Sequence, residues 1–289
     1  MSKDALSNYH PAVIFLFLAG ALCIGMVVMH PAYLIAGLAG ATLYYLLLTG
    51  KKGFRELLAL LPFFLLITLL NPLVNTRGRQ VLFTVLGRNY TFEALCYGAA
   101  IAGMFSLMLI WFRCYSLLMT SDRFTALFGN LLPALSLLLV MVLRLIPALT
   151  RKAGQISDAR AVIGKSAERS DSLRQRLLQS TNTLSALTDQ ALEGSIITGA
   201  SMKCRGYGTG KRTTFQTYRL KRQDLFLLCL LTVLLAGIWL SGGTRVMYTP
   251  RLRISPVGPG FLLYCVYILI PSVMHIFESL RWQLSLRRI

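Results

Sequence analysis

Residues 131–150 read LLPALSLLLVMVLRLIPALT, and whether this run crosses a membrane decides the arrangement of the chain. Its length is that of a transmembrane helix, since about 20 mostly apolar residues span a bilayer. Pro133, Arg144 and Pro147 interrupt the run, however, and such residues are costly or unusual inside membrane helices. The rest of the sequence has to decide between a crossing and a surface segment.

The composition is that of an integral membrane protein. Of the 289 residues, 55% are hydrophobic and only 14% are charged, whereas soluble domains carry about 25% charged residues. The net charge of +19 could indicate a nucleic-acid-binding protein, but such proteins do not also carry several apolar stretches of membrane-spanning length. The excess of Lys and Arg therefore predicts cytoplasmic loops that face anionic lipid, and nucleic acid is not expected as a partner.

The sequence indicates no metal, cofactor or catalytic site. The six cysteines lie far apart without a CxxC pair, and the three histidines are isolated and interpreted as helix-end or interfacial residues. The segment Gly206-Tyr207-Gly208 and the Gly210-Lys211 pair lack the spacing of a Walker loop. The acids in or beside the predicted spans (Glu56, Glu93, Asp224 and Glu278) all lie near span ends, so an intramembrane enzyme is not expected.

Six apolar stretches are predicted to cross the membrane. They lie at residues 12–29, 31–49, 56–74, 94–119, 224–241 and 260–280. Basic residues set the orientation, because cytoplasmic loops are enriched in Lys and Arg. Segment 151–222 carries fourteen of the thirty basic residues and five acids, so it is expected in the cytoplasm. A crossing by 131–150 would place that segment outside. We therefore predict that 131–150 lies along the inner surface, which leaves six crossings and both termini in the cytoplasm.

The sequence thus predicts an all-α polytopic membrane protein of about six transmembrane helices, with a cytoplasmic insertion of two to three amphipathic helices before the last two spans. The expected regions are a four-span N-terminal part (1–119), a cytoplasmic or interfacial part (120–222) and a two-span C-terminal part with a basic tail (223–289). Residues 78–95 alternate apolar and polar side chains around Gly87-Arg88-Asn89, which predicts a short external hairpin.

The insertion 151–222 is the only sizeable polar region, so the specific function is expected there. A turn at 164–172 separates a helical segment from a long amphipathic one that ends near Cys204. The apolar positions of the second segment recur at three-, four- and seven-residue steps and are Leu173, Leu177, Leu184, Leu187, Ala191 and Ile196. Each segment ends in an arginine beside small residues, in Ala159-Arg160-Ala161 and in Cys204-Arg205-Gly206.

Two interpretations of these arginines stay open at this point. Small neighbours leave a guanidinium exposed and let the helix end approach another surface closely, where arginine suits pairing with carboxylates or carbonyls. Alternatively, Arg160 and Arg205 only stabilise the C-terminal ends of their own helices by interacting with the helix dipole.

The chain resembles the transmembrane T component of energy-coupling factor (ECF) transporters, the family that includes the cobalt-transport permeases. The resemblance covers most of the chain and includes Tyr9-His10-Pro11, Thr91-Phe92-Glu93, Arg113, Thr120-Ser121-Asp122 and Arg144-Leu145-Ile146-Pro147. The two arginine units, forty-five residues apart, are similar to the family's paired Ala-Arg-Gly motifs. They depart from that motif because the first ends in Ala161 and the second begins with Cys204.

This resemblance implies a non-catalytic subunit of an ABC-type importer in a prokaryotic cell membrane. The two arginine units would lie at the ends of two crossed coupling helices and dock into two partner ATPases, which hydrolyse ATP. A small membrane-embedded S component would bind the substrate, a vitamin or a transition-metal ion, and would pack on a platform formed by Leu177, Leu184, Leu187 and Ala191. The alternative is the membrane subunit of another type of ABC transporter, which would present one short coupling helix with an acidic-alanine signature that this chain lacks.

Overall fold

The computed structural model describes residues 5–75, 80–85, 88–128, 133–164, 172–210, 220–242, 246–248 and 253–286. The described chain is predominantly α-helical and divides into two units. The first unit contains residues 1–124 and 218–289, and the second contains residues 125–217.

The first unit holds the long apolar helices. Its elements are the short 3-10 helix η1 (Ala5–Asn8) and the helices α1 (Pro11–Val27), α2 (Pro31–Thr49), α3 (Lys51–Leu58), α4 (Leu60–Val74), α5 (Phe92–Leu118), α9 (Arg222–Leu240) and α10 (Gly260–Leu286). The boundary between the two units falls inside α6 (Ser121–Phe128). Five of the segments are long and apolar enough to cross a membrane, namely α2, α3–α4, α5, α9 and α10. Helix α1 is also apolar but has only 17 residues. The prediction of an all-α, multi-pass membrane protein is confirmed at this level.

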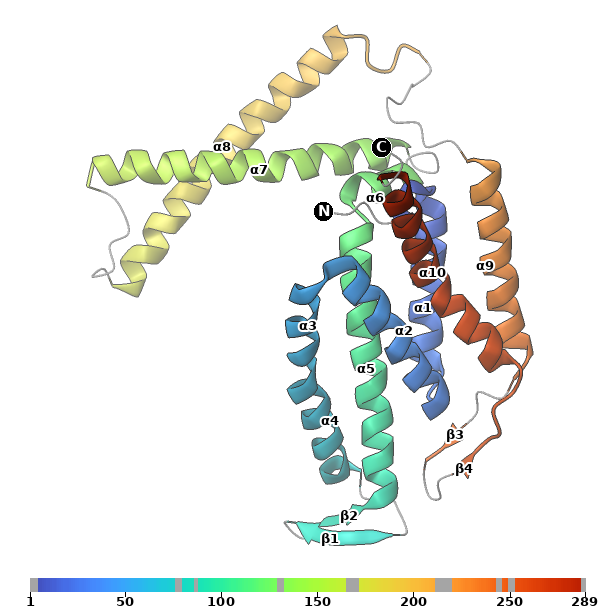
Figure 1. Ribbon diagram of the computed structural model, residues 1–289. Helices are drawn as coiled ribbons and strands as arrows, with labels where there is room; N and C mark the ends of the chain where they lie inside the picture. Colours follow the sequence, from blue (N-terminus) through green and yellow to red (C-terminus); the bar gives the residue numbers. More distant parts are fainter. Residues whose placement is uncertain are drawn as a thin grey trace. The chain divides into compact units, whose positions relative to one another are not determined.

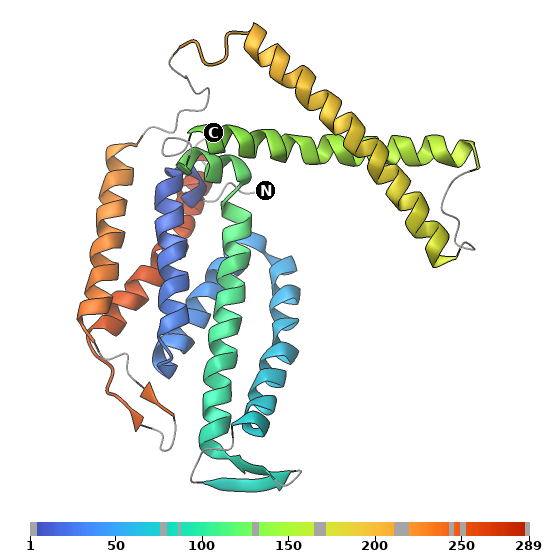
Figure 2. The ribbon, with the colours of Figure 1, turned by 180° about the vertical axis from the view of Figure 1, so that it is seen from behind.

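Successive apolar helices of the first unit run in opposite directions (Figures 1 and 2). Helices α1, α3–α4 and α9 run toward the end of the unit where the two small hairpins lie, and α2, α5 and α10 run back. The α2–α3 turn and the end of α10 therefore lie at the end opposite the hairpins. Successive membrane crossings require this alternation of direction.

Strands β1 (Val81–Val85) and β2 (Arg88–Thr91) pair antiparallel, which confirms the predicted hairpin. The hairpin is tied to the start of α5, because the buried Glu93 carboxylate accepts a hydrogen bond from the Gln80 backbone N–H at 3.2 Å. The hydroxyl of Tyr90 donates to the Leu69 carbonyl and so connects the hairpin to α4.

A second hairpin, β3 (Val246–Met247) with β4 (Arg253–Ile254), was not predicted. Its two-residue strands are too short to leave a recognisable alternation in the sequence. Tyr248 anchors this region, because its hydroxyl donates to the Met29 carbonyl at 2.6 Å. Burial raises the pKa of Tyr248, so the hydroxyl keeps its proton for this bond.

Aromatic side chains packed against glycines form the core of the first unit. The ring of Phe17 lies 5.4 Å from that of Trp111 and 5.2 Å from that of Tyr267. The Tyr267 hydroxyl donates to the Phe17 carbonyl at 2.8 Å. A Cβ atom at Gly20 would lie 2.3 Å from that hydroxyl, and one at Gly37 would lie 2.5 Å from the hydroxyl of Tyr264. Glycine at these positions lets α1 and α2 approach α10 closely enough for the aromatic rings to interlock.

The second unit consists mainly of two long helices, α7 (Pro133–Val162) and α8 (Leu173–Cys204). The sequence predicted a proline-interrupted surface run at 131–150 and a helical segment before the turn at 164–172, and the described residues of both belong to one helix. Helix α7 continues through Pro147 as one 30-residue element. Pro147 removes one backbone donor without ending the helix, and the Thr150 hydroxyl and Arg151 Nε donate to the carbonyls of Ile146 and Pro147.

Candidate docking site at the ends of two crossed helices

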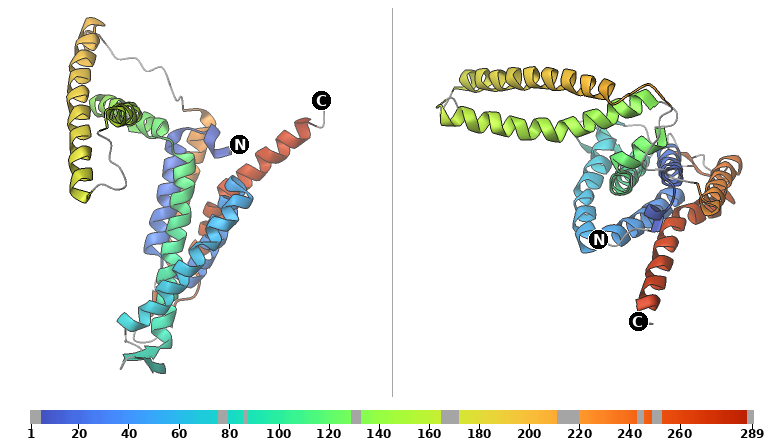
Figure 3. Two further views of the ribbon diagram at one scale, coloured as in Figure 1. Left: turned by 90° about the vertical axis from the view of Figure 1, so that its left-hand side faces the viewer. Right: turned by 90° about the horizontal axis from the view of Figure 1, so that it is seen from above.

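Helices α7 and α8 pack against each other and cross at an angle (Figure 3). They run in roughly opposite directions, so their C-terminal ends lie at opposite ends of the pair (Figure 1). Half-buried residues recur at four-residue steps on each helix, which places the facing surfaces along one row of each. On α7 this row includes Ala148, Lys152, Ile156 and Arg160, and on α8 it includes Gln179, Thr183, Leu187 and Ala191.

Both helices end at a glycine in the left-handed conformation. Gly206 has φ of 76°, and its N–H donates to the Lys203 carbonyl at 3.0 Å while the Tyr207 N–H donates to the Met202 carbonyl at 3.0 Å. This pair of bonds is the Schellman arrangement, with Arg205 as the C-cap residue. Gly164 has φ of 71° and donates to the Ala161 carbonyl at 3.0 Å, so it terminates α7 in a similar way.

The two arginines therefore differ in their position relative to the helix end. Arg205 immediately precedes its capping glycine and is exposed, whereas Arg160 lies in the last turn of α7, four residues before Gly164, and is half-buried. The sequence analysis treated the two arginine segments as equivalent because it compared the neighbours of each arginine and not the distance from each arginine to its capping glycine. Gly164 was the missed signal, since a glycine just beyond a helical segment is the usual mark of a C-terminal cap.

Neither guanidinium makes a hydrogen bond or ion pair with another described residue. Backbone N–H groups of Gly164, Gly206 and Tyr207 donate to three carbonyls at the helix ends, those of Ala161, Lys203 and Met202. An interaction of Arg160 and Arg205 with the dipoles of their own helices needs no hydrogen bond, so both interpretations of these arginines stay open. Their donors are available to an external acceptor.

Small side chains surround both arginines, as predicted. Ala159 and Ala161 are exposed beside Arg160, and Cys204 is exposed beside Arg205. With no bulky neighbour in the way, a second protein could approach either helix end to within hydrogen-bond distance of the arginine. Planar, five-donor guanidinium groups suit carboxylate and carbonyl acceptors in such a contact.

The structure divides the predicted apolar platform of α8 between two surfaces. Leu187 and Ala191 are half-buried in the row that faces α7. Leu177 and Leu184 are instead 68% and 64% exposed, together with other apolar side chains of α8: Leu173, Leu178, Leu192, Ile196 and Ile197. Only the exposed residues are free to contact a partner or lipid.

Helix α7 carries a second apolar surface in its first half. Its large exposed side chains are Leu138, Leu139, Val140, Met141, Val142, Leu143, Leu145 and Ile146. A continuous apolar run of this kind is not stable in water and marks contact with a membrane or another protein. The second unit thus combines free basic groups at its helix ends with apolar surfaces along its length.

Among the resemblance motifs, Arg113 and the α6 region take part in polar contacts within the first unit. Arg113 forms a 2.5 Å ion pair with Glu56, whose carboxylate also accepts from the Tyr45 hydroxyl at 2.6 Å, so α5, α3 and α2 are joined there. Arg123 donates to the carbonyls of Leu118 and Ser7, which holds α6 against η1. These contacts account for both arginines structurally.

No protein-family model matches the chain, and a comparison with curated proteins found no match. What the two crossed helices do is therefore inferred from their chemistry and geometry.

Proposed function

We propose that the chain is the transmembrane energy-coupling subunit of an ECF-type ABC importer. The observation that carries this proposal is the pair of arginines, Arg160 and Arg205, which bind no other described residue and lie at opposite ends of two crossed helices whose own ends are capped by glycine. Neither guanidinium binds a carbonyl of the described helix ends. These two groups are instead available for binding other proteins.

Two separate docking points favour two separate ATPase subunits. Each arginine would enter a groove on one ATPase and pair with carboxylates or carbonyls there, with its small neighbours allowing close approach. ATP-driven movement of the two ATPases would then move the ends of α7 and α8 and shift the helix crossing. The chain itself would be non-catalytic, and ATP hydrolysis would belong to the partners.

The exposed apolar surfaces of α7 and α8 support the membrane half of the proposal. They would lie at the inner membrane surface and carry a small membrane-embedded S component, which binds the vitamin or transition-metal ion to be imported. The first unit would supply the anchor, with six crossings including α1 and with both termini in the cytoplasm of a prokaryotic cell. The loops rich in Lys and Arg agree with this orientation.

The membrane subunit of another type of ABC transporter is the second candidate. Such a subunit would meet an ATPase through one short helix, whereas α7 and α8 have 30 and 32 residues and present two ends. The length and crossing of these helices therefore favour the ECF arrangement.

Purification of the tagged protein from its native membrane tests the proposal. We expect two ATPase subunits and one small hydrophobic protein to co-purify in a fixed stoichiometry, and the complex to hydrolyse ATP. The double variant Arg160→Ala/Arg205→Ala should be inserted normally but lose the ATPases. A protein that purifies without ATPases under conditions that preserve its membrane fold would contradict the proposal.

A further inference from the structure

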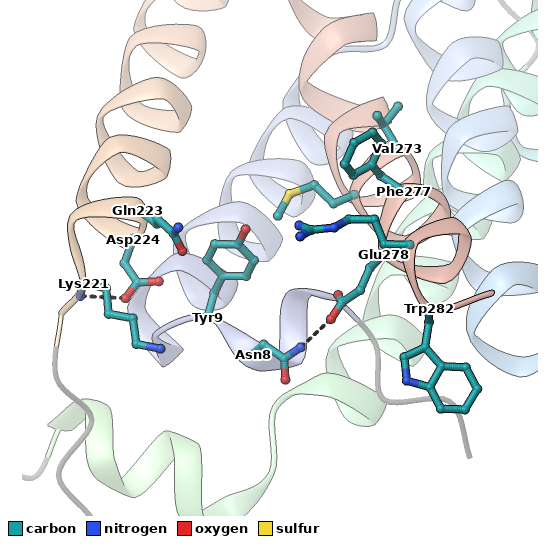
Figure 4. A pocket seen from close by; sticks show the side chains of 11 residues that line it. Asn8, Tyr9, Lys221, Gln223, Asp224, Val273, Phe277, Glu278 and Trp282 are labelled. Atoms are coloured by element: carbon teal, nitrogen blue, oxygen red, sulfur yellow. Dashed lines mark hydrogen bonds between the residues drawn. The ribbon is translucent and has the colours of Figure 1, made fainter. Parts of the chain in front are cut away.

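A cleft of about 640 Å³ lies within the first unit, where the beginning of α9 and the end of α10 meet η1 (Figure 4). Lys221, Gln223 and Asp224 line it from the α9 side. Glu278 and Trp282 lie across from them on α10, and Tyr9 lies between. All three elements belong to one unit, so the cleft is a feature of the apolar helical part of the chain itself.

The α10 wall of the cleft changes from apolar to charged along the helix axis. Val273 and Phe277 are exposed apolar residues, whereas Glu278 and Arg281 follow within the next turn. From Val273 to Arg281 the wall extends about 12 Å at 1.5 Å per residue. The apolar part lies toward the hairpins and the charged part toward the end of α10, since α10 runs in that direction. This order matches an amphiphile that enters from the membrane with its polar group at the surface.

The two carboxylates of the cleft already have hydrogen-bond donors. Buried Asp224 accepts from the backbone N–H groups of Lys221 at 2.9 Å and His10 at 3.3 Å, at the positive end of α9. Glu278 accepts from the Asn8 side-chain amide at 2.8 Å through one of its oxygens. The cationic groups of Lys221 and Arg281, in contrast, have no carboxylate partner in the part of the chain that the structure describes. The cleft thus holds two cations that form no ion pair with another described residue, beside two carboxylates that are hydrogen-bonded by neutral donors.

We propose that this cleft binds an anionic phospholipid of the inner leaflet. Lys221 and Arg281 bind its phosphate, and the first part of an acyl chain lies along Val273 and Phe277. Tyr9 and Trp282 flank the phosphate at the depth where amphipathic aromatic rings are favoured. Lys and Arg side chains between transmembrane helices on the cytoplasmic side are a recognised setting for anionic headgroups. The inference depends on membrane insertion of α9 and α10 and not on the importer role.

Quenching of Trp282 fluorescence tests the proposal on the full chain in mixed micelles of a neutral detergent. The probes are phosphatidylglycerol and phosphatidylcholine, each brominated on the upper acyl chain. A Trp282→Phe variant provides the background from Trp111 and Trp239. We expect phosphatidylglycerol to quench at a lower mole fraction than phosphatidylcholine, by about fivefold for each cation that contacts the phosphate. The double variant Lys221→Gln/Arg281→Gln should lose this difference.

The matched control is Lys51→Gln/Lys52→Gln, which removes two exposed cations from another part of the same unit and should keep the difference. Raising the salt concentration should reduce the difference in the unmodified protein, which tests the electrostatic origin without any substitution. Equal quenching by the two lipids in the unmodified protein would overturn the proposal, as would equal losses in the two double variants. Reversal of quenching by millimolar inorganic phosphate would point to a soluble phosphate ligand and would also overturn it.

Discussion

His10 and His30 each precede a proline at the start of a helix, and each accepts a hydrogen bond through Nδ1 from the backbone N–H two residues later, at 3.2 Å in both cases. The interpretation of the histidines as helix-end residues is confirmed for these two, whereas His275 lies inside α10. Because Nδ1 accepts, the hydrogen of a neutral ring is on Nε2, which allows His30 to donate to the Ser255 carbonyl at 3.1 Å.

Replacing these caps should lower stability by different amounts. We expect His10→Ala to cost about 1 kcal/mol and His10→Asn to cost little, since Asn is a good N-cap. His30→Asn should recover only part of the loss of His30→Ala, because it keeps the cap but not the bond to Ser255. Thermal unfolding in detergent would measure this order. Equal losses for His10→Asn and His10→Ala would show that the cap does not matter there.

The docking proposal makes its own prediction for single residues. A buried arginine that is truncated at an interface leaves its acceptors unpaired, at a cost of about 2–5 kcal/mol. Arg160→Ala and Arg205→Ala should therefore each weaken ATPase association or uncouple hydrolysis from uptake, and the double variant should do both. Replacing either arginine by lysine should restore little of the function, because the compact ammonium group cannot form the two parallel hydrogen bonds of a planar guanidinium. Pull-down of the ATPases together with an uptake assay measures both effects.

Lys203→Ala is the matched control for Arg205. Lys203 is an exposed basic residue in the last turn of the same helix, two positions before the arginine. If general positive charge or the helix dipole were responsible, Lys203→Ala would act like Arg205→Ala. Wild-type uptake and association in both single arginine variants would exclude docking.

At the scale of the elements, the surface of α8 predicts which leucines bind the S component. Leu177 and Leu184 are exposed, whereas Leu187 is half-buried toward α7. We expect Leu177→Asp/Leu184→Asp to release the S component without disturbing the helix pair. Leu187→Asp should instead disturb the α7–α8 crossing and so weaken both the ATPases and the S component. Co-purification of the partners with the unmodified protein, the Leu177→Asp/Leu184→Asp variant and the Leu187→Asp variant measures these effects. An intact complex in the double variant would show that the exposed face of α8 does not bind the S component.

Helix packing in the first unit gives a prediction that is independent of function. Gly37→Ala would place a Cβ 2.5 Å from the Tyr264 hydroxyl, so overpacking should cost about 1–3 kcal/mol. Tyr264→Phe removes that oxygen and should recover part of the loss. Gly199→Ala in α8 is the control, because nothing lies within 4 Å of its Cβ position and alanine favours a helix. The melting temperatures of these variants in detergent measure the effect. A Gly37→Ala protein as stable as wild type would rule out the close contact between Gly37 and Tyr264.

The sequence predicted the apolar helices well because length and hydropathy are local properties. It did not show that the run 131–150 and the helical segment after it form one helix, because the loss of one hydrogen bond at Pro147 is tolerated within the 30 residues of α7. It also could not show which apolar residues of α8 face α7: Leu187 does, whereas Leu184 does not. That division depends on the crossing of two helices, and no spacing along one helix contains it.

At the scale of the whole molecule, the alternating helix directions predict which segments share a side of the membrane. The β1–β2 hairpin lies at one end of the first unit, and the α2–α3 turn with Lys51 lies at the other (Figure 1). If the loops rich in Lys and Arg are cytoplasmic, as proposed, six crossings would place Thr84 outside and Lys51 inside. The second unit follows an even number of crossings if α7 stays at the surface, which places Ser172 inside as well.

Cysteine labelling of intact cells distinguishes this arrangement from one in which α7 crosses. On a background without the six native cysteines, we expect an impermeant maleimide to label Thr84→Cys directly and Lys51→Cys only after permeabilisation. Thr84 and Lys51 are both exposed, so burial does not limit either reaction. Ser172→Cys should behave like Lys51→Cys, because a cytoplasmic second unit is the only position from which Arg160 and Arg205 can reach ATPases. Labelling of Ser172→Cys from outside would mean that α7 spans the bilayer, and the docking proposal would fail together with the six-crossing topology.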